Sequence, residues 1–262
     1  MKKLTIIKIG GKVIDDQTAL KSFLEKISQL DVPKILVHGG GKIASDFGER
    51  LGIQPKMVEG RRLTDAETLE LVTMVYGGLV NKKIVAQLQS LGTNAIGLTG
   101  ADGNSLSAKK RQVKDIDYGF VGDVSIENVN TELLSQFLNN GLTPVFCALT
   151  HDLKGNLLNT NADTIASILA SALADKFEID LIYCFEQKGV LSDFDKESVI
   201  SVMGLSCYTE LKSKGIISEG MIPKMDNAFN ALKKGVNTVR VGHFSKINDL
   251  VNGTIEGTTI KL

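Results

Sequence analysis

Hydrophobic residues along this chain form short runs that alternate with longer stretches of amphipathic, helix-type periodicity. Six runs have the length and the β-branched or aliphatic composition of strands: 4–9, 34–38, 94–99, 143–149, 180–185 and 237–242. Their apolar character is nearly continuous, which is typical of strands that are buried on both faces. Parallel strands joined by helical crossovers bury both faces. The pattern therefore predicts an α/β fold, a three-layer α/β/α sandwich around an open, mainly parallel sheet.

Helix boundaries carry local signals between these runs. Thr64 followed by Glu67 predicts a capping box at the start of a long helix, and Ser245 is expected to open a last short helix. Another helix is predicted to begin near Ala162. The stretch 101–130 is polar and lacks helical periodicity, so we expect a hairpin there.

The chain has no Pro-rich or Ser-rich linker, so we expect one domain over residues 1–262. Two lobes would then share one continuous sheet, with their boundary near the helix that begins at Ala162. An apolar run of the length of a membrane span, about 18 residues, is absent from the sequence. The first residues are interpreted as a strand rather than a signal peptide, because Lys8 interrupts their apolar run.

Composition narrows the classes of function. At 262 residues with 43% hydrophobic residues, the chain is long enough to bury a sizeable core. Thirty Lys plus Arg balance thirty Asp plus Glu, and a net charge of zero argues against a nucleic-acid partner. Cys147, Cys184 and Cys207 are widely spaced and form no CxxC pair. We interpret them as reduced thiols of a cytoplasmic protein, with no metal site among them.

Two of the predicted strands end in glycines. The first runs Lys8-Ile9-Gly10-Gly11-Lys12, and the second is His38-Gly39-Gly40-Gly41-Lys42 ahead of an amphipathic helix. The first motif alone favours a plain turn, but a lysine within a buried strand needs a partner or a function. Neither motif is a GxxxxGK[ST] or a GxGxxG loop. Together they predict an anion site at the carboxyl edge of a parallel sheet, where helix N-termini and glycine N–H groups face a ligand.

Polar residues elsewhere complete an inventory for phosphoryl transfer. Two of the five arginines, Arg61 and Arg62, are adjacent, and a guanidinium grips a carboxylate or phosphate in a fork. Asn159, Asn161 and Asp163 precede a helix, where a cap alone needs one such residue. Lys224 follows Pro223 in the first turn of a predicted helix, where a cation is disfavoured unless an anion binds.

Five ordered motifs carry a resemblance over nearly the whole chain: KIGGK, HGGGK, EGRRLTD, LLNTNADT and EGMIPKM. With them the sequence resembles the amino acid kinase superfamily and, within it, the acetylglutamate kinase family. The resemblance implies an eight-stranded sheet and an enzyme that phosphorylates the side-chain carboxylate of an N-acylated glutamate with ATP, the second step of arginine biosynthesis. It also implies lobes at 1–165, for the acyl amino acid and dimerisation, and at 166–262, for the nucleotide.

The same resemblance assigns catalytic roles by matching position. Lys8 and Lys224 would neutralise the phosphoryl group during transfer, and Asp163 would hold both lysines. Gly11 and Gly41 would donate backbone hydrogen bonds to that group. A glutamate side chain is already ionised at neutral pH, so the reaction needs no general base. Charge neutralisation and positioning are then what the protein must supply.

Substrate binding is assigned in the same way. The amides of Gly40 and Gly41 would lie against the acyl amino acid, whose α-carboxylate would be gripped by Arg62 and Asn159, with Asn161 alongside. Arg61 is expected to be a solvated surface charge.

The nucleotide residues implied by the resemblance are Lys8, Gly10, Gly11, Glu186, Gly189, Val190, Ile217, Ser218 and Lys224. The family usually has a Ser/Thr-Asp-Val-x-Gly type segment here, and Glu186 would replace its acid while Gln187 departs from the pattern. ATP would bring Mg²⁺ on its phosphates, and we expect no direct protein ligand for the metal.

Several alternatives stay open. The stretch 97–111 departs from the family near the acyl group, so N-succinyl-L-glutamate is a candidate substrate beside N-acetyl-L-glutamate. One further interpretation is a kinase for an N-acyl-aminoadipate or another amino-acid carboxylate. Another is a catalytically inactive nucleotide or amino-acid sensor. Since the first strand begins near residue 4, we expect no N-terminal helix of the arginine-inhibited type. We expect an arginine-insensitive homodimer with small-molecule substrates, joined by the helix after Thr64; Gly77-Gly78 would allow close approach there or break the helix.

Overall fold

A central sheet of eight strands organises the chain. The computed structural model describes residues 1–58, 61–113, 115–193, 198–217, 221–254 and 257–262. The strand order is β14 (Val202–Met203), β16 (Thr258–Ile260), β15 (Thr238–His243), β11 (Phe177–Phe185), β1 (Lys2–Ile9), β2 (Lys34–His38), β8 (Thr143–Phe146) and β5 (Ala95–Leu98). Neighbouring strands are parallel except for β15 and β16. All six strands predicted from the sequence are confirmed in this sheet.

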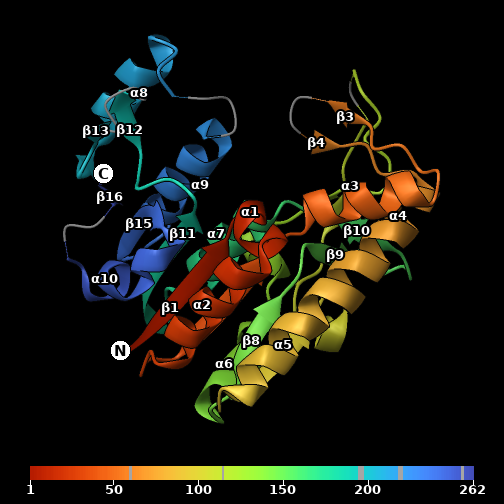
Figure 1. Ribbon diagram of the computed structural model, residues 1–262, viewed down its shortest axis with the longest axis horizontal. Coiled ribbons are helices and arrows are strands. Elements are labelled where there is room, and N and C mark those ends of the chain that lie inside the picture. Colours follow the sequence, from red (N-terminus) through yellow and green to blue (C-terminus); the bar gives the residue numbers. More distant parts are fainter. Residues whose placement is uncertain (59–60, 114, 194–197, 218–220, 255–256) are drawn as a thin grey trace.

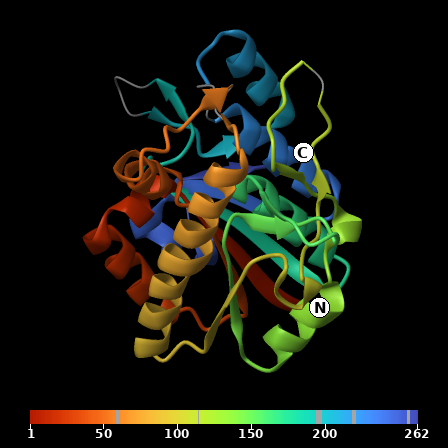
Figure 2. The same cartoon turned by 90° about the vertical axis from the view of Figure 1, so that its right-hand side faces the viewer.

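Helices cover both faces of the sheet, so the predicted three-layer α/β/α sandwich is confirmed (Figures 1 and 2). One face carries α2 (Gln17–Ser28), α5 (Asn81–Ser90) and α10 (Ile247–Asn252), and the other carries α6 (Thr131–Asn139), α7 (Ala162–Leu173) and α9 (Ile222–Lys233). Helix α7 packs against β11, β1 and β2, and also against α9.

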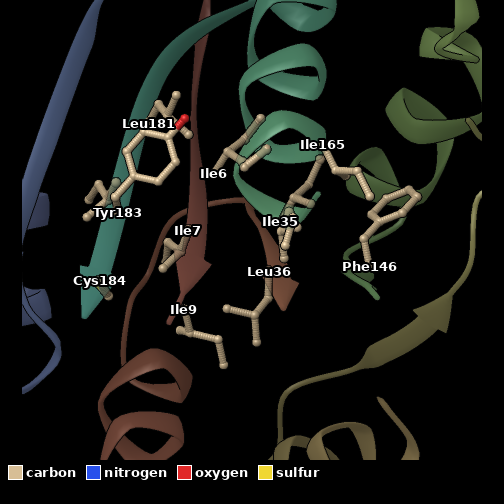
Figure 3. Packing of buried hydrophobic residues seen from close by; sticks show 14 of the residues in the cluster. Ile6, Ile7, Ile9, Ile35, Leu36, Phe146, Ile165, Leu181, Tyr183 and Cys184 are labelled. Atoms are coloured by element: carbon tan, nitrogen blue, oxygen red, sulfur yellow. The ribbon is translucent and has the colours of Figure 1, made fainter. Parts of the chain in front are cut away.

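The core lies around the central strands, as Figure 3 shows. In β1, Leu4, Ile6, Ile7 and Ile9 are all buried, so successive residues of the strand are covered from both faces. Ile6 pairs with Leu181 across the parallel ladder between β1 and β11. Two-sided burial is therefore the physical reason for the continuous apolar runs in the sequence.

Shorter elements surround the carboxyl edge of the sheet. The helices are α1 (Gly11–Asp15), α3 (Gly41–Arg50), α4 (Ala66–Val72), the π-helix η1 (Thr73–Val80) and α8 (Leu205–Ser213), with 3₁₀ turns η2 (Asp102–Asn104), η3 (Ile126–Asn128) and η4 (Phe244–Lys246). Four antiparallel pairs are β3 (Met57–Val58) with β4 (Arg61–Arg62), β6 (Lys109–Lys110) with β7 (Gly122–Asp123), β9 (Leu149–His151) with β10 (Leu157–Asn159), and β12 (Leu191–Asp193) with β13 (Ser198–Val199). The β6–β7 pair confirms the hairpin expected within 101–130.

Two helix starts predicted from the sequence are wrong. The cap of α4 is Asp65, whose side chain accepts a hydrogen bond from the Thr68 N–H at 2.9 Å, and Thr64 is buried instead. The last helical segment begins with the turn η4, where the His243 side chain accepts from the Ser245 N–H, so Ser245 does not open it.

The long helix after Thr64 is confirmed and is continuous through the glycine pair. Segments α4, η1 and α5 follow one another from Ala66 to Ser90 with helical backbone at both junctions. Gly77 and Gly78 lie within the π-helical segment and do not break the helix. Within the described residues, no helix has the length and apolar character that would let it cross a membrane. The division into lobes 1–165 and 166–262 stays a prediction.

Candidate active site

Two lysines and one aspartate meet at the carboxyl edge of the sheet. Lys8 comes from the end of β1, Asp163 from the first turn of α7 and Lys224 from the first turn of α9. The Lys8 Nζ lies 2.8 Å from Asp163 Oδ1, and the Lys224 Nζ lies 3.0 Å and 3.1 Å from the two oxygens of the same carboxylate. The three side chains are only 10–15% exposed. The structure thus brings together three residues that lie 155 and 61 positions apart in the sequence.

This cluster carries one positive charge in excess. Burial raises the pKa of the Asp163 carboxyl, but the charges of Lys8 and Lys224 and their hydrogen bonds outweigh burial and hold that pKa well below its ordinary value. Burial lowers the pKa of Lys224, and the charge of Asp163 opposes this shift. The Lys224 Nζ also lies 5.2 Å from the centre of the Tyr183 ring. One carboxylate cannot balance two ammonium groups, so the cluster is suited to an anionic ligand.

Both glycine motifs lie at this edge. The Gly10 N–H donates to the Cys184 carbonyl at 2.8 Å, and a Cβ on Gly10 would stand 3.2 Å from Phe185 Cβ. Gly11 begins α1 and Gly41 begins α3, so their N–H groups have no acceptor within their helices. Gly40 has φ +150°, and a Cβ there would lie 3.0 Å from Tyr76 Cδ1. Only glycine fits this bend, which turns the chain from β2 into α3.

Arg62 is buried beside the second glycine loop, whereas Arg61 is exposed. The Arg62 Nη2 donates to the Gly41 carbonyl at 2.8 Å and to Ser45 Oγ at 2.8 Å. Arg61 instead lines a separate pocket with Lys109 and other residues of the β6–β7 hairpin. The two adjacent arginines therefore belong to different surroundings, in agreement with the prediction for Arg61.

The three polar residues around the start of α7, Asn159, Asn161 and Asp163, have three different partners. Asn161 is the helix cap, and its side chain accepts from the Thr164 N–H at 3.0 Å. The Asn159 Nδ2 donates to Thr64 Oγ1 at 3.0 Å, and Thr64 donates in turn to the Arg62 carbonyl at 3.2 Å. Asn159 and Arg62 are thus joined through Thr64, while Asp163 holds the lysines.

The residues predicted for the nucleotide lie on the other side of Lys8. Glu186 forms an ion pair with Lys12 at 3.0 Å. The Val190 N–H donates to Thr258 Oγ1 at 2.8 Å, and a Cβ on Gly189 would stand 2.7 Å from that oxygen. Ile217 is buried, and Ser218 lies outside the described residues.

Four residues at the site were not anticipated from the sequence: Ser45, Thr64 as a linking residue, Tyr76 and His38. Thr64 was misread because its spacing to Glu67 imitates a capping box. Ser45 and Tyr76 both face the second glycine loop from helices. Their positions in the helical repeat were the only sequence signal that could have pointed to them.

The carboxylates at the site are committed to lysines and do not group around a metal ion among the described residues. In the part of the chain that the structure describes, no three His, Cys, Asp or Glu residues group so as to hold a metal ion. At the site itself, the carboxylate of Asp163 is already taken by two lysines, and Glu186 is paired with Lys12.

The chain is similar to known proteins over nearly its whole length. The chain matches the amino acid kinase family over residues 3–243. The acetylglutamate kinase of Cytophaga hutchinsonii is 56% identical over 254 residues, which cover 96% of this chain and 96% of that protein. The acetylglutamate kinase of Phocaeicola vulgatus is 54% identical over 249 residues, covering 95% and 96%.

A solved structure shows the same fold. The crystal structure of smu.665 from Streptococcus mutans UA159 has a TM-score of 0.81 at 27% identity, and the match covers 100% of this chain and 99% of that one. The family match and the full-length identity to its members lead to one conclusion: the chain belongs to the amino acid kinase family and, within it, to the acetylglutamate kinases.

Proposed function

We propose that this chain transfers the γ-phosphoryl group of ATP to the side-chain carboxylate of N-acetyl-L-glutamate. The observation that carries the proposal is the Lys8–Asp163–Lys224 cluster, in which two largely buried lysines share one carboxylate. The identity to acetylglutamate kinases supports the substrate. The product is an acyl phosphate, an early intermediate of arginine biosynthesis.

The mechanism follows from charge. The substrate carboxylate is ionised at neutral pH and attacks the γ-phosphorus directly, without a general base. As the new O–P bond forms, the bond from the γ-phosphorus to the β,γ-bridging oxygen breaks and ADP leaves. Bringing one anion against another is the main obstacle, and the lysines lower it by neutralising the transferring group. Asp163 contacts both lysines and is a positioning residue for them. The N–H groups of Gly11 and Gly41, at the starts of α1 and α3, would donate to the same group.

The residues that we assign to substrate binding lie around the second glycine loop. The Arg62 guanidinium is held by Gly41 and Ser45, so its orientation is set before a carboxylate arrives. Asn159 donates a hydrogen bond to Thr64, which in turn donates to the carbonyl oxygen of Arg62. We assign the α-carboxylate to Arg62 and Asn159, and the backbone contacts to Gly40 and Gly41. Asn161 would contribute its amide nitrogen, because its oxygen caps α7.

The nucleotide would bind between the first glycine motif and the segment after β11. Lys8, Gly10, Gly11 and Lys224 would contact its phosphates. Glu186, Gly189, Val190, Ile217 and Ser218 are the remaining residues that we assign to it. Mg²⁺ would enter on the nucleotide phosphates, since the site offers it no uncommitted carboxylate cluster among the described residues. Bound there, the metal would offset phosphate charge.

We also propose a cytoplasmic homodimer joined along the helix from Ala66 to Ser90. Met74 on this helix is 56% exposed. Apart from the adjoining residues and backbone of its own helix, no described atom lies within 4 Å of a Cβ built on Gly78, so a partner helix could approach closely. Light scattering should give twice the chain mass, and Met74→Glu should shift the protein towards monomer. A monomeric wild-type protein would contradict the dimer.

The function is tested by incubating the protein with ATP and one of three acceptors: N-acetyl-L-glutamate, N-succinyl-L-glutamate or N-acetyl-aminoadipate. Hydroxylamine traps any acyl phosphate that forms as a hydroxamate. We expect hydroxamate from N-acetyl-L-glutamate. Hydroxamate from the succinyl or aminoadipate compound alone would identify one of the alternative substrates. No hydroxamate from a folded, nucleotide-binding protein would favour a sensor.

Lysine variants connect the activity to the cluster. Lys8→Met and Lys224→Met should each lower turnover by about a hundredfold or more, because each removes a charge that acts on the transferring group. Lys21→Met is the matched control, since Lys21 is exposed on α2. Turnover near the wild-type value in Lys8→Met or Lys224→Met would reject the assigned roles.

A further inference from the structure

A buried histidine that has no role in the proposed chemistry lies directly before the second glycine loop. His38 is the last residue of β2 and is fully buried. Each of its ring nitrogens has one partner. The Nδ1 lies 2.8 Å from the carbonyl oxygen of Gly39, and the Nε2 lies 3.0 Å from the Asn81 side-chain nitrogen.

The orientation of the Asn81 amide is determined from both sides. Asn81 lies at the start of α5 and is 1% exposed. Its Nδ2 donates at 2.9 Å to the carbonyl oxygen of Val145, and a carbonyl oxygen can only accept a hydrogen bond. Its Oδ1 accepts at 3.2 Å from the ammonium group of Lys82, and an ammonium group can only donate. A reversed amide would place its oxygen against the Val145 carbonyl oxygen and its nitrogen against the Lys82 ammonium group. The amide nitrogen therefore faces His38.

This orientation determines the tautomer of His38. An amide nitrogen can only donate, so the Nε2 of His38 must accept and carries no proton. Burial lowers the pKa of His38 to about 4, the Gly39 carbonyl acts in the opposite direction, and the positive charge of Lys82 adds to the lowering. The ring is therefore neutral at physiological pH. Its single proton is on Nδ1 and is donated to the Gly39 carbonyl.

The Gly39 carbonyl matters because it shares a planar peptide with the Gly40 N–H. Holding one of these groups determines the direction of the other. Gly40 has φ +150° and the wide conformational freedom of glycine, so without an anchor this peptide could rotate. The Gly40 N–H is one of the groups that we assign to the acyl amino acid.

The edge strand β5 leaves space for the same amide. A Cβ on Gly97 of β5 would stand 2.0 Å from Asn81 Oδ1 and 2.8 Å from the Lys82 Nζ. The Lys82 Nζ also donates to the Gly97 carbonyl at 3.2 Å. Asn81, Lys82 and Gly97 therefore form one packed arrangement behind the histidine.

We propose that His38 and Asn81 are positioning residues for substrate: Asn81 selects the Nδ1–H form of His38, and His38 then holds the Gly39–Gly40 peptide with the Gly40 N–H facing the acyl amino acid. Asn81 thus acts on the substrate site through two hydrogen bonds from a different element of the fold. This inference rests on the proposed function for its substrate.

Two variants of His38 distinguish a role in positioning the Gly39–Gly40 peptide from a purely structural role in packing. In His38→Asn, the side-chain nitrogen occupies the place of Nδ1 and keeps a donor for the Gly39 carbonyl. In His38→Gln, the side-chain oxygen occupies the place of Nε2 and keeps the acceptor for Asn81, but the donor to Gly39 is lost. Glutamine is closer to histidine in length, so a purely structural role predicts that His38→Gln is the milder change.

Positioning predicts the reverse order. His38→Gln should raise the KM for N-acetyl-L-glutamate about tenfold, and His38→Asn by about threefold or less, with the KM for ATP unchanged in both. Lys83→Met is a control on the same helix, because Lys83 is exposed, and it should leave both KM values at the wild-type level. Equal effects of the two His38 variants, or a milder His38→Gln, would overturn the proposal.

The tautomer is measured independently of activity by ¹⁵N NMR of histidine-labelled protein, whose three histidines are resolved by substituting His151 and His243 one at a time. The wild type should show His38 protonated at Nδ1 and unprotonated at Nε2 near neutral pH. Asn81→Asp replaces the donor with an acceptor and should bring a proton onto Nε2. An Nε2–H form in the wild type would refute the role of Asn81. A wild type with the expected tautomer but no kinase activity would instead refute the proposed function.

Discussion

The shared carboxylate is the most informative position to perturb. Asp163→Asn keeps the size of the side chain and one acceptor oxygen but removes the negative charge between Lys8 and Lys224. Both Nζ atoms contact the same Oδ1, at 2.8 Å and 3.0 Å, so they lie at most about 6 Å apart. At that separation, two positive charges repel by about 3 kcal/mol with an effective dielectric constant of 20.

Stability should fall as a result. The variant loses two attractions and leaves this repulsion uncompensated among side chains that are only 10–15% exposed. Removing one partner of a buried ion pair typically costs about 3 to 5 kcal/mol, and we expect the free energy of unfolding to fall by this amount. Turnover should fall by about a hundredfold or more, because the lysines lose their common anchor.

Equilibrium urea unfolding of wild type and variant measures the change. The control is Glu132→Gln, which breaks an ion pair with Lys176 in which the glutamate side chain is 77% exposed. Exposed pairs contribute about 0 to 1 kcal/mol, so this control should unfold nearly as the wild type does. ATP brings negative charge to the same two lysines, and it should raise the unfolding midpoint of Asp163→Asn more than that of the wild type.

One outcome would refute the reasoning directly. If Asp163→Asn unfolded within about 0.5 kcal/mol of the wild type and kept its turnover, the carboxylate would be neither the balancing charge nor the anchor of the lysines.

Three further predictions concern neighbouring features. Because the folded pKa of Asp163 is depressed, its contribution to stability is complete above its unfolded pKa of about 4 and is lost as pH falls towards the folded pKa. The difference in unfolding free energy between wild type and Asp163→Asn should therefore be constant from about pH 5 to 8 and shrink on acidification below about pH 4; a difference that persists unchanged to pH 2 contradicts this. Arg62→Lys should raise the KM for N-acetyl-L-glutamate about tenfold, since one ammonium cannot reproduce the anchored fork, whereas Arg61→Lys should not change it. Gly40→Ala, strained at φ +150° and 3.0 Å from Tyr76 Cδ1, should destabilise the fold by about 1 to 3 kcal/mol in thermal unfolding, whereas Gly39→Ala, whose added Cβ has no described atom within 4 Å apart from the adjoining residues, should cost clearly less.

Local patterns predicted six of the eight strands of the central sheet and the glycine loops at its carboxyl edge. This succeeded because two-sided burial leaves a continuous apolar run, as in residues 4–9, and because glycine is needed where a strand bends into a helix, as at Gly40. The strands β14 and β16 were not predicted. They have two and three residues, too few to form a pattern, and pairing with their neighbours in the sheet is what makes them strands.

The helix cap at Asp65 shows where local reasoning fails. Thr64 and Asp65 are both good caps, and the spacing to Glu67 favours Thr64. The structure uses Thr64 differently, because it is buried and bonds Asn159, which is 95 residues away in sequence. A contact at that separation leaves no signal in the neighbouring residues, and it decided which of the two residues caps the helix.

The fold class and the types of residue available for phosphoryl transfer follow from the chain alone, because burial periodicity and side-chain chemistry are properties of the residues themselves. Which of these residues meet depends on how the elements pack in three dimensions. Lys8, Asp163 and Lys224 come from three separate elements and share one carboxylate because β1, α7 and α9 converge at one edge of the sheet. The tautomer of His38 was decided in the same way, by an amide on a distant helix whose orientation is set by Val145 and Lys82.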